Sequence, residues 1–183
     1  QASNFVERAN SIANEIKQSR PDLIGLQEVS LLRTQSPSDG PITPATNVSL
    51  DYLQILLDAL NVRGLYYEPI VVQAAFDAEV PGLISGSIVD LRLTDREVIL
   101  ARADSKDFTL SNIQGAQFAA NFTVTTPFGS ISIPRAWVSV DVTFEKGDKA
   151  RIVSTHLEPL LHPQLSPIIQ GLQADELLNG PGN

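Results

Sequence analysis

The stretch Arg20-Pro21-Asp22-Leu23-Ile24-Gly25-Leu26-Gln27-Glu28-Val29 decides how this chain is interpreted. Pro21 ends the segment ahead of it, because proline and the residue before it disfavour a helix. The uncharged run Leu23–Leu26 is long enough for one strand and too short for a helix, which predicts a strand buried on both faces. Glu28 follows where this strand leaves the core. In layered α/β proteins such a position is where ligand and metal chemistry collects.

A glutamate at a strand end is more often solvated or part of a cap than functional. A segment in the second half of the chain favours the functional interpretation of Glu28. Residues 151–159, Arg-Ile-Val-Ser-Thr-His-Leu-Glu-Pro, form another short β-prone run that ends in a polar residue, His156. Glu28 and His156 are therefore the first two candidate site residues.

Together these two segments resemble the endonuclease/exonuclease/phosphatase superfamily, which has the deoxyribonuclease I-like fold. Family members carry Pro-Asp, an apolar pair and Gly-Leu-Gln-Glu after a first helix, which matches residues 21–28. They also carry Thr-His-Leu at the end of a central strand, which matches residues 154–158. The resemblance implies an α/β fold of the α+β type, part of a four-layer α/β/β/α sandwich with mixed, largely antiparallel sheets. It also implies that Glu28 binds Mg²⁺, or Mn²⁺ or Ca²⁺, and that His156 contacts the scissile phosphate or its leaving group.

Two further residues are candidates on looser grounds. In deoxyribonuclease-like members an acidic residue ahead of a buried strand bonds the histidine, and Asp95, ahead of the run 98–101, falls at the matching place. An ordinary turn aspartate is the commoner alternative. Arg135 begins a strand and could reach a phosphate, although an arginine there is more often solvated. His162 has no counterpart in the family pattern and is expected at the surface, and Glu158 is expected to be structural or solvated.

Phosphoester hydrolysis explains why these residue types would occur together. A hard divalent cation prefers oxygen ligands such as the carboxylate of Glu28. An imidazole such as that of His156 can handle a proton near neutral pH, and histidine or arginine donors can neutralise charge on the reacting phosphate. The sequence thus predicts a metal-dependent phosphoester hydrolase of the phosphodiesterase, nuclease or phosphatase type. The alternative is a non-catalytic binding or interaction module on the same scaffold.

The sequence also departs from the family pattern. That pattern opens with a strand carrying an asparagine and continues with Gly-Asp-Phe-Asn and Ser-Asp-His segments, none of which is present here. We therefore expect residues 1–183 to be a single incomplete domain, corresponding to the N-terminal two-thirds of the family's domain. The rest would come from a longer chain, and these residues alone would have little activity.

Composition narrows the class of protein and its partners. A chain of 183 residues with 43% hydrophobic and 19% charged residues is neither disordered nor membrane-spanning, and it is long enough for one domain with a core. Its net charge of −8 does not favour nucleic acid as the substrate, without excluding it, because a bound divalent cation supplies local positive charge. Lipid head groups, inositol phosphates and small phosphodiesters stay open as phosphoester substrates.

The sequence contains no cysteine, which excludes disulfides and thiolate zinc sites. Two sequons, at Asn47 and Asn121, permit glycosylation. Because the sequence also has no methionine, a removed export signal is consistent with it. These features slightly favour a secreted protein.

Periodicity and breakers predict the remaining elements. Asn4 and Glu7 form a capping box for a helix that runs to about residue 19, and Ser49 and Ser166 cap helices over residues 50–61 and 167–178. Loops are expected at residues 30–48 and 77–86 because serine, proline and glycine are frequent there. The expected strands cover residues 65–76, 88–93 and 98–101, a meander over 108–144 with turns at 127–129 and 145–149, and a returning strand at 150–154.

Overall fold

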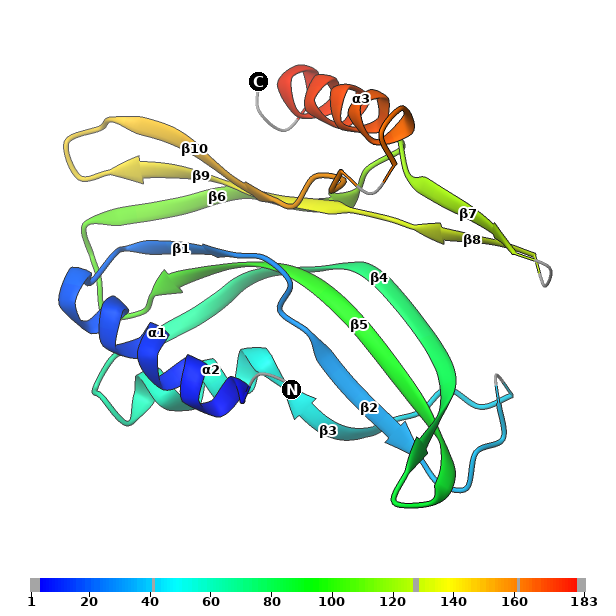
Figure 1. Ribbon diagram of the computed structural model, residues 1–183. Helices are drawn as coiled ribbons and strands as arrows, with labels where there is room; N and C mark the ends of the chain where they lie inside the picture. Colours follow the sequence, from blue (N-terminus) through cyan, green and yellow to red (C-terminus); the bar gives the residue numbers. More distant parts are fainter. Residues whose placement is uncertain (1–3, 41, 127–128, 161, 181–183) are drawn as a thin grey trace.

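The computed structural model describes residues 4–40, 42–126, 129–160 and 162–180, and it has the α+β fold expected from the sequence (Figure 1). Along these residues the elements are α1 (Phe5–Ser19), β1 (Leu23–Leu26), β2 (Leu31–Gln35), β3 (Asn47–Asp51), α2 (Tyr52–Asn61), β4 (Tyr67–Ile84), β5 (Ser87–Arg102), β6 (Phe108–Gln117), β7 (Phe122–Thr126), β8 (Gly129–Ile133), β9 (Ala136–Phe144), β10 (Lys149–Thr155) and α3 (Leu165–Asn179). The described helices contain no segment long and apolar enough to cross a membrane.

The first sheet is built around β5, which is antiparallel to all three of its neighbours. β4 pairs with β5 along nearly its whole length, from Tyr67↔Arg102 to Ile84↔Ser87. The other edge of β5 is shared, since β1 pairs with residues 98–101 and β2 pairs with residues 90–94. Residues 95–97 of β5 therefore lie opposite the point at which the chain leaves β1 and has not yet entered β2. β3 completes the sheet beside β2.

The second sheet has the order β10-β9-β6 and lies face to face with the first (Figure 1). One hydrophobic core lies between the sheets and includes Ile99, Val138, Val140 and Val142. A second core lies on the other face of the first sheet, where α1 and α2 cover it with Ala9, Ala13, Leu56 and Leu60 against Val98 and Leu100. Alternate residues of β5 thus face opposite layers, as the period of a strand requires.

Helix α3 lies on the outer side of the second sheet (Figure 1). Its buried residues are polar, Ser166 and Gln173, whereas Ile168 and Leu172 are exposed. No residue of α3 belongs to either hydrophobic core cluster of the described residues. The α+β class holds, and the four-layer arrangement stays a prediction.

Two expected loops are wrong because each contains a strand. Residues 30–48 include β2 and the start of β3, although neither alternates clearly between polar and apolar residues. Residues 77–86 belong largely to β4, which continues to Ile84 despite Pro81 and Gly82. Proline is tolerated there because β4 is an edge strand of its sheet. In both cases pairing with β5 overrides the local preference of the sequence.

Smaller expectations also need correction. β1 is half-buried and Gly25 is exposed, because β1 is a short edge strand and not a strand covered on both faces. Asn4 makes no side-chain cap hydrogen bond to α1, so the capping box is not formed. Asp51 caps α2 in place of Ser49, and α3 begins at Leu165 after Gln164. β7 and β8 pair as expected, with residues 127 and 128 of their turn outside the described residues.

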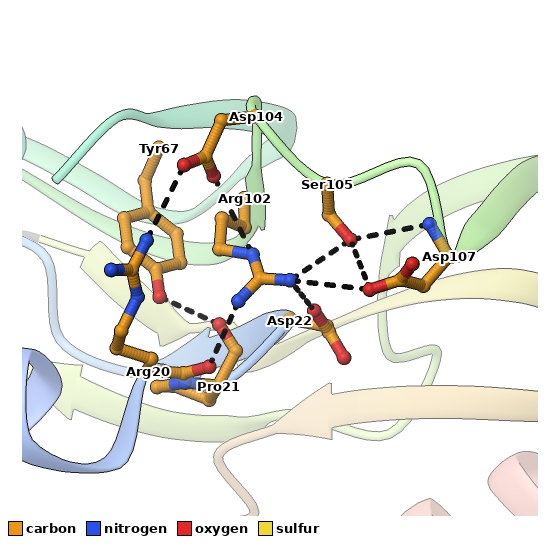
Figure 2. A network of polar contacts seen from close by, with 8 residues as sticks. All are labelled: Arg20, Pro21, Asp22, Tyr67, Arg102, Asp104, Ser105 and Asp107. Carbon is orange, nitrogen blue, oxygen red and sulfur yellow. Dashed lines mark hydrogen bonds and ion pairs between the residues drawn. The ribbon is translucent and has the colours of Figure 1, made fainter.

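A network of ion pairs and hydrogen bonds joins the start of β1 to the end of β5 (Figure 2). The Arg102 guanidinium forms ion pairs with Asp22 at 2.8 Å and Asp104 at 3.5 Å. The hydroxyl of Tyr67 donates a hydrogen bond of 2.6 Å to the carbonyl of Pro21. The Pro-Asp pair that opens the deciding stretch is therefore structural, and it lies at the opposite end of β1 from Glu28.

Candidate functional site

Glu28 lies in the segment between β1 and β2, residues 27–30, which passes residues 95–97 of β5. The backbone N–H of Val29 donates to the carbonyl of Arg96 at 3.0 Å, which holds this segment against β5. Glu28 itself has φ +54°, a left-handed conformation that few residues with a side chain adopt. Such an unusual conformation persists when the surrounding structure fixes it, and it is often found at functional sites.

The second sheet approaches this segment closely. The side-chain amide of Gln27 donates a 2.9 Å hydrogen bond to Oγ of Ser154 on β10. A Cβ atom on Gly25 would lie 2.8 Å from the same Ser154 Oγ, so only glycine allows β1 and β10 to approach this far. The glycine and glutamine of the deciding stretch thus bring the end of β10 beside Glu28.

The structure brings together Glu28 and His156, which the sequence predicts to share a site. Nδ1 of His156 lies 3.7 Å from Oε1 of Glu28 and 3.3 Å from Nη1 of Arg135. The His156 side chain is 28% exposed and that of Glu28 is 66% exposed, so the glutamate is the more accessible of the two. Three of the four predicted site residues therefore form one group where the two sheets meet.

Glu158 is a site residue that the sequence does not reveal. It is buried, and Nε of Arg135 lies 3.5 Å from its Oε2. Its backbone is held by α3, because its N–H donates to Oε1 of Gln173 at 2.8 Å and its carbonyl accepts from Nε2 of Gln170 at 2.5 Å. Its carboxylate oxygens have no hydrogen-bond partner among the described residues, so Arg135 is the cation that balances its buried charge. Arg135 is thereby held between Glu158 and His156.

Asp95, the fourth predicted residue, lies on the same side of β5 as the space between the sheets. Burial raises the pKa of its carboxyl group, and the negative charge of Glu28 raises it further, while His156 and Arg135 oppose this. Oδ1 of Asp95 accepts a 3.2 Å hydrogen bond from the Arg96 backbone N–H. The expected hydrogen bond from Asp95 to His156 is not among the contacts of the described residues, and the relation that remains between them is the effect of His156 on the pKa of Asp95.

Glu97, two positions along β5, is a second residue that the sequence does not reveal. Its side chain is fully buried and neither carboxylate oxygen has a hydrogen-bond partner in the described structure. Its pKa is raised from 4.5 to about 8, chiefly by burial and also by the negative charges of Asp95 and Glu28, while the positive charge of Arg135 opposes the rise. At neutral pH the group therefore carries a proton, which avoids an unpaired buried charge.

The donor chemistry of the site suits a hard divalent cation in part. Glu28 offers an accessible carboxylate, and Asp95 places negative charge beside it. Among residues 4–40, 42–126, 129–160 and 162–180, no group of three or more acidic, histidine or cysteine side chains is arranged to hold a metal ion. Mg²⁺ is commonly held by one or two carboxylates, with waters and substrate phosphates as its other ligands. Glu28 could therefore serve as one protein ligand of Mg²⁺, with waters and a substrate phosphate as the others.

A cavity of about 470 Å³ opens at the site and is lined by Glu28, Asp95 and Arg135 together with apolar side chains of α1, α2 and the sheets.

His162, the other histidine, is half-buried and has a structural role. Its Nδ1 accepts hydrogen bonds from the backbone N–H groups of Gln164 and Leu165, which begin α3. This interaction replaces the serine cap expected from the sequence.

Comparison of the chain with models of protein families, with curated proteins and with solved structures gives no match. The function is therefore argued from the residues of this chain.

Proposed function

We propose that the chain is part of a metal-dependent phosphoester hydrolase of the endonuclease/exonuclease/phosphatase type. The observation that carries the proposal is the convergence of Glu28 with Arg135 and His156, two residues that flank the distant β9–β10 hairpin. An accessible carboxylate, an imidazole and a guanidinium can serve as the metal ligand, the hydrogen-bond donor and the anion-binding group in hydrolysis of a phosphoester.

The role of His156 follows from its contact with Arg135. A guanidinium only donates hydrogen bonds, so at 3.3 Å Nη1 of Arg135 donates to Nδ1 and the imidazole proton lies on Nε2. The Nε2–H group is then the donor toward a phosphate oxygen or the leaving oxygen. Glu28 Oε1, at 3.7 Å from Nδ1, is too far for a hydrogen bond and is left to accept a cation.

Arg135 is the anion-binding residue of this proposal. Its Nε faces Glu158 and its Nη1 faces His156. A guanidinium has five N–H donors in a rigid fork, so donors remain for the oxygens of a phosphate. Glu28 would hold Mg²⁺, which when bound polarises the phosphate and stabilises the leaving oxygen.

The second candidate function is a non-catalytic binding module. It is favoured by the lack, among the described residues, of a converging group of three metal-ligating side chains. Binding without turnover in the natural full-length protein would support this function and not the hydrolase.

Metal binding at Glu28 can be tested without an activity assay, because the chain has two histidines and only one lies at the site. We expect substoichiometric Mn²⁺ to broaden the side-chain NMR signals of His156 strongly and those of His162 weakly. Glu28→Gln should abolish this difference, whereas Glu68→Gln, an exposed glutamate on β4, should leave it intact. Equal broadening of both histidines in the unchanged chain would contradict metal binding at Glu28.

Catalysis is tested separately in the natural full-length protein. Hydrolysis of bis-p-nitrophenyl phosphate should require Mg²⁺ and fall by about 100-fold or more in Glu28→Gln and in His156→Ala. Full activity in both variants would rule out the assigned roles.

A further inference from the structure

A stacked aromatic pair lines the cavity beside Glu28. Phe5 at the start of α1 and Tyr52 at the start of α2 stack with ring centroids 3.7 Å apart and planes 2° from parallel. The guanidinium carbon of Arg8 lies over the Phe5 ring, 5.7 Å from its centroid. All three residues line the cavity, so this part of its surface is composed of planar groups.

The rest of the cavity combines apolar and charged walls. Leu26, Phe76 and Leu93 line it from β1, β4 and β5, while Glu28 and Arg135 line it from the site. A ligand seated in the cavity would therefore meet charged groups, the guanidinium of Arg135 and the carboxylates of Glu28 and Asp95, and also an apolar, partly aromatic surface. With a divalent cation on the carboxylates, this arrangement would be complementary to a molecule with one anionic end and one apolar end.

We propose that this cavity binds the organic group of a small phosphoester, with an aromatic ring of that group packed against Phe5 and Tyr52 while the phosphate lies at Arg135 and Glu28. The inference rests on the proposed function and specifies its substrate class. A volume of about 470 Å³ suits a small molecule. Because Phe5 and Tyr52 stack on each other and Arg8 lies over Phe5, a ligand ring would meet the edges of this pair, and edge-to-face contacts between aromatic rings are favourable.

The test compares three non-hydrolysable phosphonates by calorimetric titration in the presence of Mg²⁺. Methylphosphonate reports the anion site alone, phenylphosphonate adds an aromatic ring, and hexylphosphonate adds a flexible chain. We expect phenylphosphonate to bind at least about tenfold more tightly than methylphosphonate, because its ring leaves water for an apolar wall. Hexylphosphonate should bind more weakly than phenylphosphonate.

Phe5→Leu removes the ring and keeps an apolar side chain, so it should abolish most of the phenyl advantage and leave methylphosphonate affinity within about twofold. Val6→Ala, on the neighbouring exposed position of α1, is the matched control and should change neither affinity. In the unaltered chain, nuclear Overhauser effects from the phenyl protons to Leu26 and Leu93 should place the ring independently of any variant.

The possible results distinguish failure of the aromatic-ring assignment from failure of the proposed hydrolase function. Equal affinities for methyl- and phenylphosphonate, or tighter binding of hexylphosphonate, would overturn the aromatic assignment and leave the phosphate site intact. Methylphosphonate affinity unchanged by both Glu28→Gln and Arg135→Met would overturn the proposed function itself, and the substrate class with it.

Discussion

Among single residues, Glu97 shows most clearly how burial keeps an acidic group of the site uncharged. The folded protein raises its pKa from 4.5 to about 8, so the folded state binds this proton more tightly than the unfolded state does. The free energy of unfolding should therefore fall as pH rises from about 4.5 to about 8, by up to about 1.4 kcal/mol per pH unit from this group. Below that window the stabilisation is fully present, and above it no further loss occurs.

We expect Glu97→Gln, which keeps the shape and removes the titration, to flatten this pH dependence. Urea denaturation at pH 5, 6.5 and 8 with EDTA present measures it. Glu68→Gln should keep the slope of the unaltered chain, because Glu68 is exposed. A Glu97→Gln variant that loses stability with pH as steeply as the unaltered chain would show that Glu97 is not the titrating group.

Glu158 gives a second prediction, because its buried carboxylate is the counter-ion of Arg135 at 3.5 Å. Glu158→Gln leaves Arg135 without a balancing charge, and we expect it to lower the free energy of unfolding by about 3 kcal/mol. In an Arg135→Met background the same change should cost much less. A cost that is equal in both backgrounds, measured by chemical denaturation, would show that the pair is not the cause.

The sequence identifies the accessible members of the site and misses the buried ones. Glu28 and His156 are found because each follows a short apolar strand inside a recognisable pattern. Glu97 looks like an ordinary surface glutamate, and for Glu158 a structural or a solvated role was expected without a choice between them, since periodicity does not say which layer will cover either residue. One signal was available for Glu97, which alternates with Asp95 and Ile99 and so shares the face of a buried residue.

At the scale of elements, Asp51 at the start of α2 has two roles, a helix cap and an ion pair with Arg96, and two substitutions can distinguish them. Oδ1 of Asp51 accepts the N–H of Leu53 at 3.0 Å and also contacts Arg96 Nη2 at 2.5 Å. Asp51→Asn keeps a capping oxygen and removes the charge, whereas Asp51→Ala removes both. We expect Asp51→Ala to be less stable than Asp51→Asn by about 1 kcal/mol, the contribution of the cap.

Ser49→Ala tests the cap that the sequence alone suggests. Because Ser49 lies within β3 and its hydroxyl donates to the carbonyl of Leu32 at an exposed position, its loss should change stability by less than about 0.5 kcal/mol. Thermal denaturation measures all three variants. A larger effect from Ser49→Ala than from Asp51→Ala would reverse the assignment of the cap.

The boundaries of an element can be predicted from sequence where local residues determine them. They cannot be predicted where pairing with another strand determines them. The bounds of α1 and the β9–β10 hairpin follow from apolar periodicity and turn residues. β2 and the outer half of β4 contain polar residues, proline or glycine, and they are strands because β5 offers them a hydrogen-bonding edge. The partner edge is distant in sequence for β2 and lies across a tight turn for β4, and in both cases the composition of the strand itself does not indicate it.

At the scale of the whole molecule, the Arg102 network (Figure 2) contacts Asp22 before β1, whereas Glu28 of the candidate site follows β1, so the two lie at opposite ends of this strand. We expect Arg102→Met to lower the free energy of unfolding by about 1 kcal/mol, and by less in 1 M NaCl, because its partners are largely at the surface. Broadening of His156 by Mn²⁺ should be unchanged in this variant. Loss of that broadening would mean that the two ends of the sheet are coupled.

The central position of β5 has a consequence for the order in which a ribosome-bound chain can assemble. β1 and β2 are synthesised early, yet the strand that both must join ends only at Arg102. β4 and β5, joined by a tight turn, can zip together as soon as they emerge, since closing a short loop costs little entropy. The first quarter of the chain, with Glu28 in it, must therefore wait for a template made later, and the carboxylate of Glu28 can reach its place only after β5 has emerged.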